Sequence, residues 1–252
     1  MTTPAMHLTG LSKSFGGTPV VVDLDLVVPP GCFLGVLGPN GAGKTTTLSM
    51  AVGLLRPDAG LCEVLGVDVW RDPVRAHALL GVMPDGLALP ERLTGPEVLR
   101  YTGLLHGLAP DEVSSRSAEL LFALDLADQH DKAVVAYSTG MRKKLGLALA
   151  LVHAPRVLVL DEPFEAVDPV SATTIRAILA AFRDGGGTVV MSSHALEVVE
   201  HVCDRVAIID RGNVVVAGTL DEVRGHRSLA EAFTAVLGDD AVPPQGLAWL
   251  RG

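Results

Sequence analysis

The chain has 252 residues, of which 48% are hydrophobic, and a formal net charge of −9 at pH 7. This length fits one α/β domain with a sizeable core, and the acidic balance argues against nucleic acid as a partner, because phosphate binding at scale needs a basic face. Three isolated cysteines, no basic and apolar leader, and no run of roughly 18 apolar residues together predict a cytoplasmic protein without a spanning helix.

The N-terminal residues 5–30 alternate apolar and polar positions around a glycine turn at Gly16-Gly17. This alternation predicts a pair of antiparallel strands. Phe15 stands at the end of the first strand. An aromatic ring at that position either belongs to the core or stacks on a nucleotide base.

The next segment is a glycine-rich loop between a predicted strand and a predicted helix. Residues 32–37 are apolar, GPNGAGKTT follows at residues 38–46, and a helical pattern continues to residue 52. The loop fills the pattern GxxxxGKS/T, in which backbone N–H groups surround the phosphates of a nucleotide. Lys44 is expected to reach the β and γ phosphates, and the Thr45 hydroxyl to bind Mg²⁺. The residues expected to surround the phosphates are Gly38, Pro39, Asn40, Gly41, Ala42, Gly43, Lys44, Thr45 and Thr46.

The middle of the chain changes from a strand period to a helical period. Residues 61–65 and 79–83 each have the short apolar pattern of a strand. Beyond Asp85 the apolar residues recur at helical spacing, and Pro110-Asp111 marks a helix start. The pattern predicts a helical subdomain, at about residues 85–150, inserted into a strand-rich core.

A short apolar run, residues 157–160, ends in Asp161-Glu162. Such a run suits a central parallel strand that is buried on both faces. Ligands of parallel sheets bind beyond the carboxyl ends of the strands, which places the acidic pair near Lys44. Two carboxylates beside a phosphate loop repel each other unless a cation lies between them, so we expect one to bind a metal and the other to face water.

The C-terminal third is predicted to alternate helix and strand. Pro169 begins an apolar helical stripe that ends at residues 185–187, and residues 188–193 form a strand that leads to His194. A histidine after a strand is either structural or catalytic, and its position at the same edge as Asp161 keeps both readings open. We further expect a hairpin in residues 205–217, a short helix in residues 229–237 and a loosely held tail in residues 238–252.

Over about residues 5–237 these motifs, in this order, resemble the ATP-binding subunit of an ABC transporter, most closely the exporter type. GPNGAGKTT is similar to the family's phosphate loop, VLVLDEP to its second nucleotide motif, and AVDP and SSH to the two motifs that follow. YSTGM at residues 137–141 stands where the family has its signature, usually LSGGQ. The resemblance implies an α/β P-loop NTPase fold over residues 1–237, with a mainly parallel sheet, an N-terminal antiparallel β subdomain and an inserted α-helical subdomain.

The resemblance also implies a head-to-tail dimer that encloses two ATP molecules, each between the phosphate loop of one subunit and the signature of the other. Asp161 would hold Mg²⁺ together with Thr45 and Asp85, Glu162 would polarise the attacking water, and His194 would contact the γ phosphate. Phe15 would stack on adenine. The residues assigned to nucleotide contact outside the loop are Phe15, Asp85, Ser138, Gly140 and Asp168.

Three residues depart from the family pattern. Thr139 replaces a signature glycine and brings a β-branched side chain to a place of close phosphate approach. Met141 replaces the usual glutamine, with less expected effect. Asp85 replaces a glutamine, and its carboxylate is a shorter and charged Mg²⁺ ligand.

The leading hypothesis is an ATPase that energises export by separate membrane-spanning permease subunits, on the inner face of the membrane. The apolar loop at residues 87–90 is the expected docking surface. The alternatives are an ATP-gated binding module with little hydrolysis, because of Thr139, and a soluble relative that acts on DNA or ribosomes. The sequence leaves open the transported substrate, the direction of transport, and whether the ATPase dimer contains one or two kinds of subunit.

Overall fold

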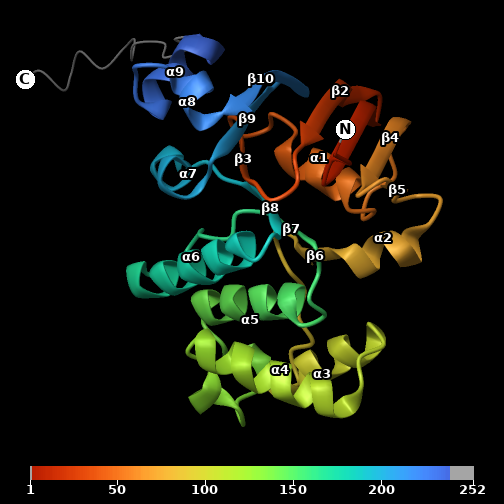
Figure 1. The fold of residues 1–252 in the computed structure, drawn as a ribbon, viewed down its shortest axis with the longest axis vertical. Helices are drawn as coiled ribbons and strands as arrows, with labels where there is room; N and C mark the ends of the chain where they lie inside the picture. The colour runs from red at the N-terminus through yellow and green to blue at the C-terminus, as the bar shows by residue number, and fades with distance from the viewer. Residues whose placement is uncertain (1, 239–252) are drawn as a thin grey trace, which may run out of the picture.

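Two β-sheets organise the computed structural model, which describes residues 2–238 (Figure 1). The tail expected at residues 238–252 therefore lies, apart from Gly238, outside the described residues. None of the helices in residues 2–238 is both long enough and apolar enough to cross a membrane.

The larger sheet has six strands in the order β10-β9-β3-β8-β7-β6. Five of them run parallel, and β10 pairs antiparallel with β9 as the expected hairpin. This mainly parallel sheet confirms the predicted α/β fold class. Its strands are β3 (Phe33–Leu37), β6 (Leu80–Met83), β7 (Val157–Leu160), β8 (Thr188–Ser192), β9 (Arg205–Asp210) and β10 (Asn213–Thr219).

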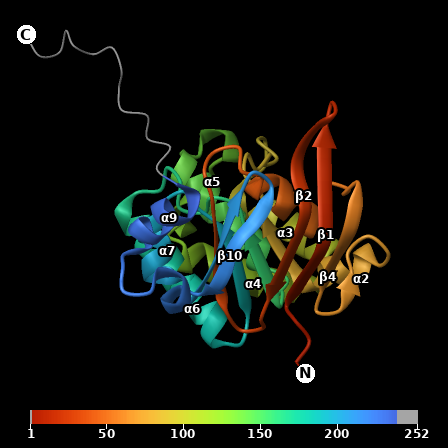
Figure 2. The same cartoon turned by 90° about the horizontal axis from the view of Figure 1, so that it is seen from above.

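The smaller sheet is antiparallel and has the order β2-β1-β4-β5. The predicted hairpin of the first 30 residues supplies only two of its strands, and the other two come from the segment after the phosphate loop. Figure 2 shows β1, β2 and β4 side by side on one flank of the molecule. The strands are β1 (Met6–Phe15), β2 (Thr18–Val28), β4 (Ala59–Val64) and β5 (Val67–Asp68).

The helices form two groups (Figure 1). Those between β6 and β7 lie at one end of the molecule and are α3 (Gly95–Leu105), α4 (Pro110–Ala123) and α5 (Thr139–Leu151), with 3-10 turns at Ala127–Gln129 and Val134–Ala136. The others flank the sheets and are α1 (Lys44–Ala51), α2 (Pro73–Leu79), α6 (Pro169–Asp184), α7 (Leu196–Val202), α8 (Leu220–Arg224) and α9 (Leu229–Leu237). The short helices α2, α7 and α8 have no counterpart among the elements predicted from the sequence.

The larger sheet is covered on both faces. Side chains alternate across a strand, so neighbouring residues of β7 enter different clusters. Val157 and Val159 pack into the cluster that contains the antiparallel sheet, and Leu158 and Leu160 pack into the cluster that contains α5 and α6. Burial on both faces explains why this strand is a continuous apolar run rather than an alternating one.

All three cysteines are buried and unpaired. Burial is the main cause that raises the pKa of Cys32 to about 11 and that of Cys62 to about 12, and it also raises the pKa of Cys203. The thiols therefore stay protonated near neutral pH.

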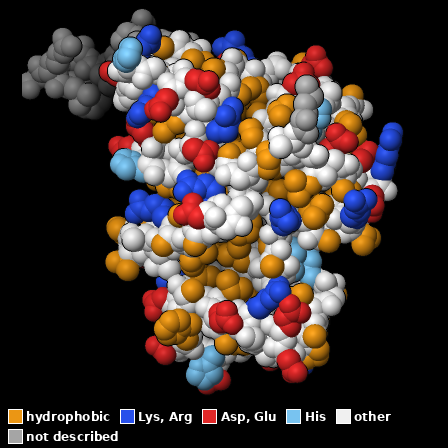
Figure 3. Space-filling model, in the orientation of Figure 1, with side chains coloured by type: hydrophobic (Ala, Val, Ile, Leu, Met, Phe, Trp, Pro, Cys, Tyr) orange, Lys and Arg blue, Asp and Glu red, His pale blue; other side chains and the backbone are white. Residues whose placement is uncertain are grey.

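At the surface, Figure 3 shows acidic and basic side chains interspersed over one face of the described residues.

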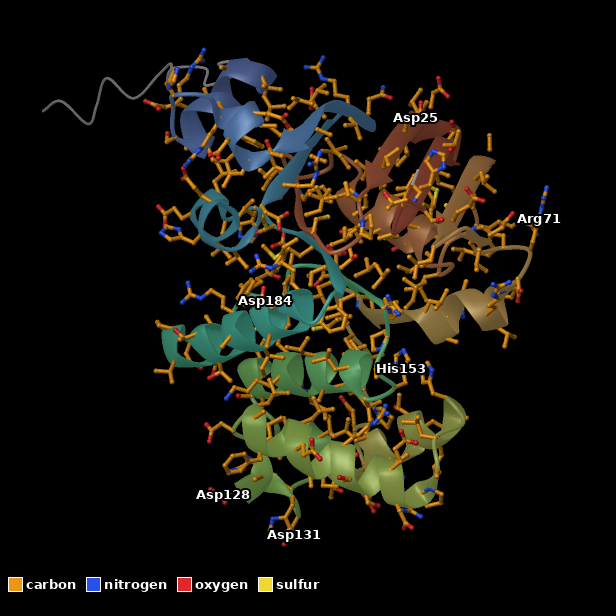
Figure 4. All side chains as sticks on the ribbon, in the orientation of Figure 1. Asp25, Arg71, Asp128, Asp131, His153 and Asp184 are labelled. Carbon is orange, nitrogen blue, oxygen red and sulfur yellow. The ribbon has the colours of Figure 1, made fainter. Side chains whose placement is uncertain are left out.

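A stacked pair of histidines joins the inserted helices to the core. The rings of His106, which follows α3, and His153, which follows α5, are parallel within 10° with centroids 3.8 Å apart. His153 Nε2 donates to the carbonyl oxygen of Leu80 at 2.8 Å, beside α2 and β6 (Figure 4). Burial, and then the neighbouring His106, lowers the pKa of His153 from 6.5 to about 4.

This histidine makes stability depend on pH. The unfolded chain binds more protons than the folded chain between pH 6.5 and 4, so the free energy of unfolding decreases as pH falls through that window. The decrease is at most about 3 kcal/mol and smaller in practice, because the ring is partly exposed. In urea unfolding at pH 7.5, 6.5, 5.5 and 4.5, the free energy of unfolding should decrease less with falling pH for His153→Leu than for wild type. Equal slopes would show that His153 does not cause the effect.

Candidate active site

Four neighbouring parallel strands end at the same edge of the larger sheet, and a candidate residue follows each one. Leu160 of β7 pairs with Met83 of β6 and with Met191 of β8, and Val36 of β3 pairs with Ser192. The chain then continues to Gly38 after β3, Asp85 after β6, Asp161 after β7 and His194 after β8. The common register therefore brings segments that are far apart in sequence to one place.

The glycine-rich loop is tightly packed against the rest of the core. A Cβ atom at Gly38 would collide with the carbonyl oxygen of Ile209. Gly43 has φ +101° at the start of α1, and a Cβ atom there would lie 2.9 Å from the carbonyl oxygen of Val20. These glycines are required by the fold of the loop as well as by any ligand.

Lys44 begins α1 and is buried under the loop, with 8% of its surface exposed. Its Nζ donates to the carbonyl oxygens of Gly38 at 2.7 Å and Pro39 at 3.2 Å. Burial lowers the pKa of Lys44, and the nearby carboxylates Glu162 and Asp161 oppose this shift. The ammonium thus lies inside the curve of the loop, where it can neutralise a bound anion.

A cavity of about 400 Å³ opens above the loop, a size that suits a small-molecule ligand. The structure brings together here most of the loop, the candidate Asp85, and the pair Glu162 and His194. The lining residues are Val20, Asn40, Gly41, Ala42, Gly43, Lys44, Thr45, Thr46, Asp85, Glu162, Glu165 and His194.

Hydrogen bonds fix the acidic pair at the end of β7. Asp161, only 4% exposed, accepts the hydroxyl hydrogen of Ser192, and the Glu162 N–H donates to the same hydroxyl oxygen at 2.9 Å. Glu162 has φ +48°, a left-handed conformation that is uncommon for a residue with a side chain. Its Oε2 lies 3.0 Å from His194 Nδ1. The pair therefore presents one enclosed carboxylate and one carboxylate that faces the cavity beside an imidazole.

Besides Gly38, Pro39 and the enclosed Asp161, four candidates are absent from the cavity lining. Phe15 is 49% exposed at the end of β1, and Asp168 caps α6 by accepting the N–H groups of Val170 and Ser171, each at 3.0 Å. Ser138 caps α5 by accepting the Met141 N–H at 3.3 Å, and Gly140 follows in the first turn. None of these four residues contributes to the cavity above the phosphate loop.

The donor atoms at the sheet edge fit Mg²⁺. Thr45 offers a hydroxyl oxygen, and Asp161 and Asp85 offer carboxylate oxygens, which are the hard ligands that Mg²⁺ prefers. Within residues 2–238 no three His, Cys, Asp or Glu side chains form a metal-binding group of their own. That arrangement is compatible with Mg²⁺, which proteins usually hold by one or two carboxylates together with substrate phosphates.

Three polar residues at this site were not predicted from the sequence. Ser192 bonds both acidic residues, Glu165 lines the cavity, and Lys143 donates to the carbonyl oxygen of Glu162 at 2.9 Å. Only Ser192 had a signal, because it is a hydroxyl at the end of the strand that leads to His194. The other two contacts depend on how α5 and the loop after β7 approach each other.

The sequence profile described as "ABC transporter" matches residues 21–165, which is more than half of the chain. The matched span contains the phosphate loop and the acidic pair. The chain belongs to the ABC transporter family. The resemblance noted from the motifs is thereby confirmed.

The family assignment agrees with individual relatives of this ABC protein. This chain is 40% identical, over 222 residues, to the daunorubicin/doxorubicin resistance ATP-binding protein DrrA of Streptomyces peucetius. The aligned residues make up 88% of this chain and 67% of the relative. A solved ATP-binding subunit of an ABC transporter superposes with a TM-score of 0.87 at 28% identity, over 93% of this chain and all of the other. A dimeric post-hydrolysis ATP-binding cassette with ADP and phosphate shares the fold, with a TM-score of 0.79 at 21% identity over 85% of this chain and 98% of the other.

These comparisons make the chain an ATP-binding and ATP-hydrolysing subunit of the ABC transporter family. The docking surface expected at residues 87–90 includes the exposed residues Ala88 and Pro90, but one of its residues is buried. Leu89, in the apolar loop expected to dock a partner, is only 7% exposed and belongs to the cluster formed with the inserted helices. A charge at Leu89 would therefore disturb folding and would not report on docking.

The hydroxyl of Ser192 generates a prediction for this ABC ATPase. Ser192→Ala removes the group that orients Asp161, the predicted Mg²⁺ ligand, and the backbone of Glu162. Mg²⁺-dependent ATP hydrolysis should therefore fall by about 10- to 100-fold, the usual loss when a group that orients a metal ligand is removed. Steady-state phosphate release at several Mg²⁺ concentrations measures the effect. The control is Ser193→Ala, because the Ser193 hydroxyl accepts the N–H of Ala195 at 3.0 Å and bonds neither acidic residue within residues 2–238. Equal losses in both variants would contradict the assignment.

Proposed function

We propose that two such subunits form a head-to-tail dimer in which each ATP lies between the phosphate loop of one subunit and the signature, residues 137–141, of the other. The observation that carries this proposal is the position of Ser138 and Gly140, which begin α5 and do not line the cavity of their own chain. A dimeric cassette with the same fold supports it.

The space around Gly140 also supports a ligand across the interface. A Cβ atom added at Gly140 would meet nothing within 4 Å, so the folded chain itself does not require glycine there. The N-terminus of α5 additionally offers backbone N–H groups and a positive dipole end, which favour a phosphate. Thr139, the residue between Ser138 and Gly140, is exposed at this same end.

Within each site, Lys44 and the loop N–H groups bind the β and γ phosphates, and Phe15 supports the adenine. Glu162 acts as the general base that polarises the attacking water, and His194, 3.0 Å from its carboxylate, holds the γ phosphate near that water. Thr45, Asp161 and Asp85 are the residues that would hold Mg²⁺, which neutralises charge on the transferred phosphoryl group when bound. Asp168 supports the adjacent loop from the start of α6.

We further propose that hydrolysis energises export by separate membrane-spanning permease subunits, which bind this subunit at the inner face of the membrane. The relative in Streptomyces peucetius is described as a resistance protein for daunorubicin and doxorubicin, which supports an exported substrate. ATP-driven closing of the dimer and its release after hydrolysis would be the conformational step passed to the permease.

A second candidate function is ATP-gated closing with slow hydrolysis. Thr139 favours it, because the exposed β-branched side chain lies beside the proposed phosphate contacts of Ser138 and Gly140. Glu162 favours the first function, because its carboxylate faces the cavity and its backbone is held by three hydrogen bonds.

The deciding experiment measures Mg²⁺-ATP hydrolysis as a function of protein concentration for wild type and Glu162→Gln. The wild-type rate per chain should rise with concentration because each site needs two subunits. Glu162→Gln should lower the rate by about 10²- to 10⁴-fold, the range for loss of a general base, while it still binds ATP. A concentration-independent rate would contradict the shared site, and an active variant would contradict the role of Glu162. Slow wild-type hydrolysis with tight, ATP-dependent dimers would favour the second candidate.

The signature can be tested by opposite effects on stability and activity. Gly140→Ala should stabilise α5 by up to about 1 kcal/mol, because alanine is the better helix former and the space is open. The same methyl group should lower ATP hydrolysis about tenfold or more by displacing the phosphate of the opposite subunit. Thermal unfolding and phosphate release measure the two effects. A stabilised variant with full activity would show that the first turn of α5 does not contact nucleotide.

A further inference from the structure

The backbone of Glu162 is held on both sides. Its N–H donates to Ser192 Oγ at 2.9 Å, and its carbonyl oxygen accepts from Lys143 Nζ at 2.9 Å and from the Glu165 N–H at 3.2 Å. These contacts enclose a residue whose φ of +48° is uncommon for a side chain of this size. A residue with a side chain keeps this left-handed backbone conformation only where the surrounding structure fixes it.

Lys143 differs from the other two partners because it comes from the inserted helices. It lies in α5, five residues after Ser138, the cap of that helix. The half-buried Lys143 makes a charge-assisted hydrogen bond, a type that is stronger than a neutral one. Lys143 thus directly connects the signature helix, α5, to the acidic loop after β7, which contains Glu162, in the same chain.

The middle of α5 also packs closely against residues on either side of Asp85. A Cβ atom at Gly146 would lie 2.7 Å from Leu87 Cδ2 and 3.2 Å from Met83 Cγ, so the helix packs closely there. Lys143 is three residues earlier, almost one turn away. A shift of α5 along this contact would therefore move the ammonium relative to the carbonyl oxygen of Glu162.

We infer that Lys143 is a positioning residue that ties the signature helix α5 to the backbone of Glu162, the proposed general base of its own subunit. This inference rests on the proposed function, in which the signature of one subunit contacts the nucleotide bound by the other. Engagement of α5 on that nucleotide would then set the orientation of Glu162 at the subunit's own phosphate loop. The two nucleotide sites of a dimer would be coupled through Lys143 in each chain.

The neighbouring cations do not share this contact. The Arg142 guanidinium donates to the carbonyl oxygen of Val135 at 3.4 Å and lies 3.8 Å from Glu91. Lys144 is buried and lies 3.6 Å from Asp125. Arg142 is therefore a matched control, because its removal takes one positive charge from the same turn and leaves Glu162 untouched.

The test compares Lys143→Met, Lys143→Arg and Arg142→Met in the state, isolated or bound to its permease, in which the wild type hydrolyses ATP. Lys143→Met should lower kcat by about 10- to 100-fold, the loss that a displacement of about 1 Å in a catalytic group produces. The dissociation constant of ATP should not change, because Lys143 does not line the nucleotide cavity. Lys143→Arg should recover most of the rate, and Arg142→Met should retain it.

Three outcomes would overturn the inference: an unchanged kcat in Lys143→Met, a loss of ATP affinity equal to the loss of rate, or an equal loss in Arg142→Met. If Lys143→Met does not fold, as thermal unfolding would show, Lys143→Gln replaces it, because the amide still donates but carries no charge. Glu162→Gln in the same assay distinguishes a failure of the proposed function from a failure of the role of Lys143. A fully active Glu162→Gln contradicts the proposed function itself, whereas an inactive Glu162→Gln beside a fully active Lys143→Met contradicts only the role of Lys143.

Discussion

The parallel register of four buried strands is the constraint on which the rest of the structure depends. Because β3, β8, β7 and β6 are neighbours and end together, the chain leaves the core at one edge four separate times. Polar groups that are costly inside the core lie just beyond that edge, where hydrogen bonds such as that between Ser192 and Asp161 satisfy them. The register can hold only while both faces of the sheet stay covered, which the antiparallel sheet and the helices α5 and α6 accomplish.

The site has two levels of organisation. The phosphate loop is rigid by packing, since Gly38 and Gly43 leave no room for side chains and Lys44 is bonded to the loop carbonyls. The acidic loop after β7 is rigid by hydrogen bonds that come from β8 and from α5. The first level belongs to the core alone, whereas the second includes the inserted helices. A motion of those helices relative to the core is therefore expected to affect the chemistry more than the binding of nucleotide.

The sequence predicted the elements whose local signals agree with their environment. The buried strands predicted at residues 32–37 and 157–160, the helix that begins at Pro169 and the hairpin at residues 205–217 all form, the first strand beginning one residue later, at Phe33. The sequence did not reveal that β4 joins β1, because antiparallel pairing across a phosphate loop and a helix leaves no local pattern. It also placed Leu89 on the surface, because an apolar loop residue looks the same whether it contacts a partner or its own core. Contacts such as that of Lys143 with Glu162 depend on tertiary geometry, and a lysine in a helix has no sequence feature that specifies them.

The burial of the three cysteines has a practical consequence for work on this protein. A thiol reacts as the thiolate, and Cys32, Cys62 and Cys203 are buried with raised pKa values. The native chain therefore offers maleimide reagents no reactive thiol, and a cysteine introduced at an exposed position is labelled selectively without removing the natural ones. Fluorophores or spin labels attached in this way can follow the approach of two subunits in the otherwise unaltered protein.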